Sequence, residues 1–252
     1  MSGVEVARVG GVLQVILDAP ERRNALSAAM LDSLVGAIGA PGEDVTGIVL
    51  TGSETTFSAG ADFADLTGTS ADIGYDDRVS AVAAAVAASR VPVLAALEGP
   101  CFGAAAHLAL VCDARIAGDG VYLSVPAIRL GLLYNPDAIA WLARHYPRDT
   151  IRRLFLLAER FDASEAAAAG LVSTVVPAGT ARDHATKLLA SITPAARDAV
   201  AATRRLLDDL DAGDPERFDA AQWQRRRREL LDSPERAAAI VDAKRRHTVA
   251  PR

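Results

Sequence analysis

Two runs of alternating apolar and polar residues open the chain, from Val4 to Val9 and from Val12 to Leu17, and they flank Gly10-Gly11. Alternation with a period of two is the pattern of a half-buried strand, and a Gly-Gly step tolerates the positive φ of a tight turn. These residues predict a β-hairpin.

Helical and extended patterns then alternate through the first two thirds of the chain. We expect helices over 27–38, 76–89 and 103–111, and extended or strand segments over 47–52, 93–97 and 114–117. The sequence Asn135-Pro136-Asp137 provides a cap, a proline at the first helical position and an acid in the first turn. Asp162 to Glu165 resembles a capping box, and Gly170 can end the helix that it starts.

The pattern changes after Val176-Pro177, where helix follows helix. Helices are predicted over 181–191, 194–210, 215–231 and 234–246, each bounded by Pro or Gly. We therefore expect an α/β body over residues 1–180 and a helical C-terminal region over residues 181–252.

Composition narrows the class of protein. The chain has 252 residues, half of them hydrophobic, which is enough for a large buried core. Its net charge of −5 favours neither nucleic acid nor an anionic membrane as partner, and the arginine run 225–228 is flanked by Asp219 and Glu229, as in an ion-pairing surface. The N-terminus has no secretory pattern and no apolar segment approaches transmembrane length, so a cytoplasmic protein is expected.

The cysteine and histidine spacing points away from metal chemistry. Cys101 and Cys112 have no CxxC spacing, so two reduced thiols are expected. His145, His184 and His247 have no partner spacing for a metal ligand set. We expect no metal site.

Small residues fill the turn after the third apolar run, in the segment TGSETTFSAGADF from Thr51 to Phe63. Glycine and alanine leave backbone amides unshielded, so the N–H groups near Gly60 and Ala61 can reach a ligand oxygen. An ordinary strand-to-helix turn is the alternative explanation.

A second turn of small residues runs from Leu97 to His107, LEGPCFGAAAH, again where a strand enters a helix. Two such turns can aim two N–H donors at one carbonyl oxygen, and the helix dipole reinforces the second. The pair predicts an oxyanion hole. Neither turn has the glycine spacing of a dinucleotide loop or the Gly-Lys-Ser/Thr of a Walker loop, and a GxSxG elbow is missing.

Several segments occur in the order and spacing of the crotonase superfamily, the enoyl-CoA hydratase/isomerase family. The resemblance covers nearly the whole chain and is carried by RNAL (23–26), IVLTGSETTFSAGADF, LEGPCFGAAAHLALVCDARIAG, VPAIRLGLL and FDASEAAAAGLVSTVVP. It implies a ClpP-like spiral of ββα units and a C-terminal region that packs homotrimers or homohexamers. It also implies an acyl-CoA thioester substrate, with coenzyme A as part of the substrate and no permanently bound cofactor.

The same resemblance assigns residues to the site. Ala61 and Ala104 would give the backbone N–H groups that hold the thioester oxygen. The remaining residues that the resemblance places along the CoA path or near its phosphates are Arg22, Arg23, Ala25, Ala59, Asp62, Phe63, Gly103 and Lys244, with Arg245 as an alternative to Lys244. Ordinary surface charge explains the arginines and Lys244 equally well.

The chain departs from the family at both catalytic glutamates. The resemblance places His107 at one position and Ala127 at the other, and alanine transfers no proton, so water addition by the usual mechanism is in doubt. His107, one helical turn after Ala104, is the remaining acid/base candidate; a histidine hydrogen-bonded in a vestigial pocket is the alternative. Asn135 and Asp137 are weaker candidates, because helix capping and the helix dipole explain them.

Two functions from different classes follow. The first is an enzyme that stabilises an acyl-CoA enolate, with a double-bond shift or decarboxylation demanding less proton machinery than hydration. The second is a non-catalytic acyl-CoA binding protein, and a structural paralogue that binds no CoA is a third, weaker option.

Overall fold

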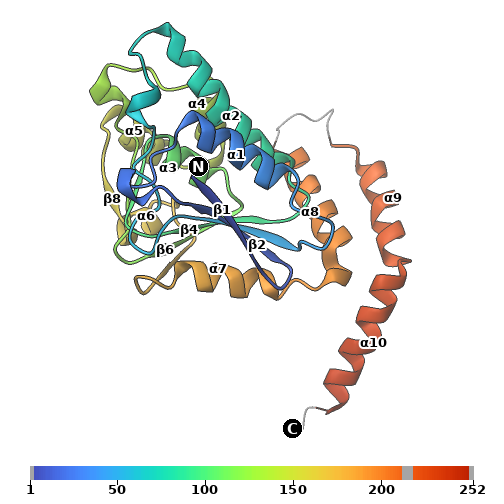
Figure 1. Ribbon diagram of the computed structural model, residues 1–252. Helices are drawn as coiled ribbons and strands as arrows, with labels where there is room; N and C mark the ends of the chain where they lie inside the picture. Colours follow the sequence, from blue (N-terminus) through green and yellow to red (C-terminus); the bar gives the residue numbers. More distant parts are fainter. Residues whose placement is uncertain (1–2, 212–217, 250–252) are drawn as a thin grey trace. The chain divides into compact units, whose positions relative to one another are not determined.

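The computed structural model describes residues 3–211 and 218–249. It divides into two compact units, Met1–Ala190 and Ser191–Arg252. Figure 1 shows the first unit as a sheet with α1 and α2 on one face and α7 on the other.

The central sheet of the first unit is mixed, because its hairpin is antiparallel and the remaining pairs are parallel. Val9 pairs with Val12 across the Gly10-Gly11 turn, which confirms the predicted hairpin. The strands in spatial order are β1 (Val4–Val9), β2 (Val12–Leu17), β3 (Gly47–Thr51), β4 (Val93–Leu97), β6 (Ala114–Gly118) and β9 (Thr174–Val176).

A smaller sheet lies beside the second turn of small residues. It contains β5 (Pro100–Phe102), β7 (Tyr122–Ser124) and β8 (Phe161–Asp162). The sequence pattern did not predict β5, because three residues between two glycines are too few to show a period.

Three helices of the first unit begin at their predicted caps, whereas the second helix begins at Ile73 instead of residue 76 and the helix Arg148–Leu156 was not predicted. Ser27 caps the first helix through the N–H of Met30, Asn135 caps the fourth, and Asp162 and Glu165 form the predicted capping box of the sixth. These helices are α1 (Ala28–Gly39), α2 (Ile73–Ala88), α3 (Ala104–Leu110), α4 (Pro136–His145), α5 (Arg148–Leu156), α6 (Ala163–Ala168) and α7 (Ala181–Ala190).

Short 3-10 segments connect these elements in the first unit, and another precedes the helices of the second unit. They span Pro20–Arg22, Phe63–Asp65, Ser70–Asp72, Pro126–Leu130 and Pro194–Ala196.

Helix α7 packs on the central sheet, so the first unit extends beyond residue 180, where the sequence predicted the boundary between the two regions. The carboxylate of Glu98 accepts a hydrogen bond from the N–H of Ala181 (3.1 Å), and Gln14 donates to the hydroxyl of Thr186 (3.0 Å). Leu189 packs so closely on Gly47 that a Cβ added to this glycine would lie 2.7 Å from a terminal methyl carbon of Leu189. These contacts place α7 in the first unit, which ends at Ala190.

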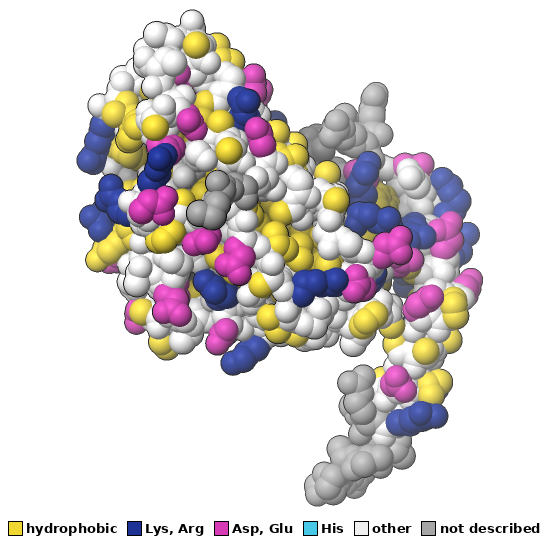
Figure 2. All heavy atoms as spheres, viewed as in Figure 1, with side chains coloured by type: hydrophobic (Ala, Val, Ile, Leu, Met, Phe, Trp, Pro, Cys, Tyr) yellow, Lys and Arg dark blue, Asp and Glu magenta, His cyan; other side chains and the backbone are white. Residues whose placement is uncertain are grey.

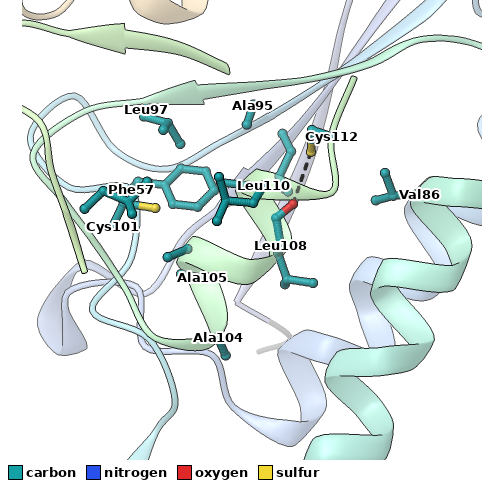
Figure 3. Close-up of a cluster of buried hydrophobic side chains, with 14 of the residues drawn as sticks. Phe57, Val86, Ala95, Leu97, Cys101, Ala104, Ala105, Leu108, Leu110 and Cys112 are labelled. Atoms are coloured by element: carbon teal, nitrogen blue, oxygen red, sulfur yellow. Dashed lines mark hydrogen bonds between the residues drawn. The ribbon is translucent and has the colours of Figure 1, made fainter. Parts of the chain in front are cut away.

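The core of the first unit is apolar and close-packed around α3. Phe57 and Phe161 are among its largest fully buried side chains. Figure 3 shows the Phe57 ring among Leu97, Cys101 and Leu110, with the Cys112 thiol donating to the carbonyl of Leu108. Both cysteines are buried, and no disulfide joins them, as the sequence predicts.

The second unit is made of α8 (Arg197–Asp211), α9 (Ala220–Leu231) and α10 (Pro234–Val249). A groove of about 560 Å³ runs among these helices and is lined by apolar side chains that include Leu206, Phe218, Trp223 and Leu230. The predicted helix over 194–210 begins as a 3-10 segment, and residues 215–217 of the next predicted helix lie outside the described residues.

Charged side chains are distributed as the composition predicts. Figure 2 shows basic and acidic side chains interspersed over the visible face of the first unit. In the arginine run, Arg225 pairs with Asp219 (3.7 Å) and Arg226 with Glu229 (3.0 Å), which confirms the ion-pairing interpretation. Among the described residues, no helix is long and apolar enough to cross a membrane.

Candidate functional site

The two turns of small residues lie against each other. Ser58 donates its N–H to the carbonyl of Pro100 (3.0 Å) and accepts from the N–H of Phe102 (3.1 Å). Gly60 has φ +94, and a Cβ on it would lie 2.7 Å from the carbonyl oxygen of Phe102. Only glycine allows this φ together with this approach of two backbones. The tertiary structure therefore joins the two motifs that are forty residues apart in sequence.

The second turn ends at Gly103, which has φ +55 and precedes the first residue of α3. Its N–H donates to the carbonyl of Ser124 (2.9 Å), and its carbonyl accepts from the N–H of His107 (3.1 Å). Figure 3 shows Ala104 at the start of α3, with its side chain directed away from the Phe57 ring. The turn thus presents the backbone of Ala104 at the beginning of the helix.

Two backbone donors follow the contacting glycines. Within the described part of the chain, no protein group accepts a hydrogen bond from the N–H of Ala61 or of Ala104. Ala61 is half-buried and Ala104 is buried. Partly enclosed N–H groups without a protein acceptor have the character of an anion or carbonyl site.

The segment before α1 fixes the first turn. Leu26 donates its N–H to the carbonyl of Gly60 (2.7 Å) and accepts from the N–H of Asp62 (3.1 Å). Asn24 is fully buried and donates to the carbonyls of Thr56 (3.0 Å) and Phe57 (3.2 Å). These bonds hold the backbone around Ala61 in place.

Arg22 and Asp62 form an ion pair beside this turn, at 2.7 Å. The N–H of Ala64 and the Arg22 guanidinium together lower the pKa of Asp62. The neighbouring Phe63 is 69% exposed. The Asp62 carboxylate is therefore engaged within the protein, whereas the Phe63 ring presents an open aromatic face.

The other residues assigned to the CoA path lie close to this pair or in the second unit. Arg23 is exposed, and its carbonyl accepts from the N–H of Ala59 (2.9 Å). Ala25 and Ala59 are half-buried. Lys244 and Arg245 are both exposed on α10, which belongs to the second unit. The remaining residues of the predicted CoA path lie in the first unit: Arg22, Arg23, Ala25, Ala59, Asp62, Phe63 and Gly103.

His107 is buried on α3, with 4% of its surface exposed. Among the described residues, its Nδ1 is the buried side-chain nitrogen without a hydrogen-bond partner. Burial lowers the pKa of His107 to about 4. Burial therefore keeps the imidazole neutral at pH 7.

Tyr134 lies against His107 from the loop before α4. The two ring centroids are 5.9 Å apart with an interplanar angle of 80°, and Phe155 lies 5.3 Å from Tyr134. Burial raises the pKa of Tyr134, and the charge of Asp76 adds to this effect. The phenol therefore stays protonated at neutral pH.

The weaker sequence candidates have structural tasks. Asn135 accepts from the N–H groups of Asp137 (2.9 Å) and Ala138 (3.2 Å), so it caps α4. Asp137 is exposed in the first turn of that helix, and Ala127 lies half-buried against the core.

Two residues of α2 were missed by the sequence reasoning. Tyr75 donates its hydroxyl to the carbonyl of Leu26 (2.7 Å), and Ser80 accepts from the Asn135 side chain at 3.4 Å. The helix predicted over 76–89 includes Ser80 but not Tyr75, and nothing in the sequence indicates that this helix faces the 134–135 loop. Among the described residues, no group of His, Cys, Asp and Glu side chains has an arrangement that holds a metal.

Comparison with known proteins identifies the family of this chain. The enoyl-CoA hydratase/isomerase family model matches residues 7–224. A Mycobacterium bovis protein named probable enoyl-CoA hydratase echA6 is 33% identical over 207 residues, which cover 82% of each chain. The 2,3-dehydroadipyl-CoA hydratase of Escherichia coli K12 is 32% identical over 75% of this chain and 74% of its own.

Solved structures share the fold over almost the whole chain. A protein from Hyphomonas neptunium described as a member of the enoyl-CoA hydratase/isomerase family has a TM-score of 0.86 at 27% identity, covering 96% of this chain and 95% of its own. A Thermobifida fusca protein described as an enoyl-CoA hydratase, in complex with CoA, has a TM-score of 0.77 at 27% identity with the same coverage. The chain has the crotonase fold and belongs to the enoyl-CoA hydratase/isomerase family.

Proposed function

We propose that this protein is an enzyme that binds an acyl-CoA thioester and stabilises its enolate in a backbone oxyanion hole. The observation that carries the proposal is the contact between the two small-residue turns. Each turn contains one backbone N–H group, that of Ala61 or Ala104, for which no acceptor is found among the described residues. Two such donors stabilise the negative oxygen of an enolate more than the neutral thioester oxygen, and this difference is what accelerates proton removal.

The proposed CoA path runs beside the first turn. Ala25, Ala59 and Gly103 offer backbone without bulky side chains, and the exposed ring of Phe63 offers a stacking surface to the adenine. Arg22 and Arg23 are the proposed phosphate partners, although Arg22 must then be shared with Asp62. Lys244 of the second unit is a further proposed partner. The CoA complex of the Thermobifida fusca relative supports the choice of ligand.

We propose an enolate reaction other than the two-carboxylate addition of water. Ala127 carries no proton, and protonating His107 would create a cation in an apolar environment. A double-bond shift needs only the removal and return of one proton, and a decarboxylation needs only one protonation. His107 then supplies a neutral imidazole for hydrogen bonding or proton transfer.

Exchange of the acyl α-proton with solvent tests the enolate directly. Crotonyl-CoA, but-3-enoyl-CoA and butyryl-CoA are incubated with the protein in D2O, and deuterium at each carbon is followed by mass spectrometry and NMR. Exchange or isomerisation with at least one of them is expected. Saturable binding without exchange in any of them would reject the enzyme and leave the second candidate.

That second candidate is a non-catalytic acyl-CoA binding protein. The absence of a carboxylate at residues 107 and 127 favours it. It requires the same oxyanion hole as a grip on the thioester, so calorimetry alone does not separate the two functions. Failure to bind any CoA thioester would reject both.

We also propose that the second unit mediates self-association into a trimer or hexamer. Its apolar groove is lined by residues of α8, α9 and α10, and no residue of α8 or α9 is buried within the described chain. Apolar surface of this kind is typical of an interface between subunits. The cytoplasmic location stays a prediction.

A further inference from the structure

A closed circuit of contacts links the two turns of small residues to α3, to the 134–135 loop and to α2. Gly60 lies against the backbone of the second turn, and His107 follows in the first turns of α3. The ring of His107 meets Tyr134, and Asn135 reaches α2 at Ser80. Tyr75 of α2 then returns to the first turn through the carbonyl of Leu26, which pairs with Gly60 and Asp62. Helix α2 is therefore part of this circuit of contacts.

Asp76 is a residue of α2. It is one residue from Tyr75, which is tied to the first turn, and one helical turn before Ser80, which is tied to the 134–135 loop. Residues four apart lie on one face of a helix, so Asp76 and Ser80 share the face that meets this loop. The electrostatic effect of Asp76 on the Tyr134 hydroxyl agrees with this placement.

The surroundings of Asp76 suit a group that exchanges a proton. It is half-buried, and no ion pair within the described residues reaches it. Burial raises the pKa of Asp76, with the charges of Asp77 and Asp72 as further causes. A carboxylate whose pKa is raised accepts a proton more readily than an ordinary aspartate does.

Asp76 has an advantage over His107 in this task. A carboxylate becomes neutral when it takes a proton, whereas His107 would become a buried cation, which its lowered pKa already disfavours. Asp76 is also partly open to solvent, so both of its protonation states are accessible.

We propose that Asp76 is the catalytic carboxyl group of this site, a role that rests on the proposed function. It removes a proton from the carbon next to the thioester of a 3-enoyl-CoA, and the electron pair passes into the enolate held by Ala61 and Ala104. The Asp76 acid then returns the proton to the fourth acyl carbon while the double bond moves to the second and third carbons. Atoms and charge balance without a further reactant.

The test compares Asp76→Asn with Asp76→Glu and with Asp77→Asn. Asp77 is the exposed neighbouring acid, so its variant is a matched control for charge on α2. But-3-enoyl-CoA is the probe, and three quantities are measured: its dissociation constant, its isomerisation rate, and deuterium incorporation at the second and fourth acyl carbons. Circular dichroism and thermal melting check that each variant is folded.

The expected result is a loss of at least about 100-fold in isomerisation and exchange for Asp76→Asn, with binding within about 3-fold of wild type. Asp76→Glu should keep part of the rate. Asp77→Asn should stay within about 3-fold of wild type, because burial and not the charge of Asp77 is the main cause of the raised pKa of Asp76. Asp76→Asn with wild-type rates would overturn the assignment, as would a wild type that binds the probe without exchanging its protons. A wild type that binds no CoA thioester would instead reject the proposed function itself.

Discussion

The ring of Tyr134 meets the imidazole of His107 edge-on, with the centroids 5.9 Å apart and 80° between the planes. Phe155 packs on Tyr134 in turn, so the histidine lies in an aromatic and apolar environment. These contacts place a titratable group, the loop before α4 and the end of α5 in one packing unit. It is the physical reason that the pKa of His107 falls to about 4.

Burial of His107 should make the protein less stable as the pH falls from 7 to 4. The pKa of His107 is lower in the folded chain than its ordinary value of 6.5. As the pH falls below 6.5, the unfolded chain therefore binds the proton first, and this binding stabilises the unfolded state relative to the folded state. The loss is on the order of 3 kcal/mol by pH 4. Urea unfolding at a series of pH values measures it.

The variant His107→Leu provides the comparison. It removes an imidazole whose Nδ1 lacks a partner among the described residues, so its stability should be equal to or about 1 kcal/mol above that of wild type at pH 7. Its stability should also fall less between pH 6.5 and 4. Identical pH profiles for the two proteins would contradict the burial of an ionisable His107.

The N–H of Ala104 is open to a direct test. Ala104 is the first residue of α3, where proline is well accommodated, so Ala104→Pro deletes the donor with little effect on the helix. We expect a loss on the order of 100-fold or more in α-proton exchange with an acyl-CoA.

Ala104→Gly is the matched control, because it keeps the N–H and changes only the methyl group. Its exchange rate should stay within about 10-fold of wild type, since a first-turn glycine costs only about 1 kcal/mol in helix stability. Equal rates for the proline and glycine variants would argue against this N–H as an oxyanion donor.

The ion pair of Arg22 with Asp62 should contribute modestly to stability. Asp62→Asn removes the charge from a side chain that accepts from Ala64 (3.0 Å) and Arg22 (2.7 Å). We expect a loss of about 1 kcal/mol in the free energy of unfolding at pH 7, because Arg22 is mostly exposed and solvent screens the pair.

This loss should depend on pH. The pKa of Asp62 is lowered on folding, so its contribution is present above the ordinary Asp pKa and is lost as the pH falls through the folded value. Denaturant titrations of both proteins should therefore converge in acid. A constant difference down to the lowest pH would show that the effect of the substitution is not electrostatic.

The groove of the second unit predicts an association defect. Trp223 lines it, so Trp223→Glu should convert the proposed trimer or hexamer to smaller species in light scattering coupled to size exclusion. Leu157→Glu alters an exposed leucine of the first unit and is the control. A wild-type monomer, or an unchanged mass for Trp223→Glu, would contradict the proposed role of the groove.

Local patterns predicted much of the fold because they act over a few residues. The hairpin Val4–Leu17 needs only alternation and a Gly-Gly turn, and the helices that start at Asn135 and Asp162 need only a cap. Helix α7 was assigned to the wrong unit, because its place depends on Glu98, Gln14 and Gly47 in distant strands. Helical periodicity identifies a helix but not the surface that it covers.

The sequence alone determined the crotonase fold, the two small-residue turns and the absence of a carboxylate at residues 107 and 127, because each is a matter of residue type and order. Only the tertiary structure decided that Gly60 touches the second turn, that His107 is buried against Tyr134, and that α2, the helix of Asp76, meets the 134–135 loop. The reason is physical: burial, pKa and contact depend on which distant segments pack together, and local sequence patterns do not encode that packing.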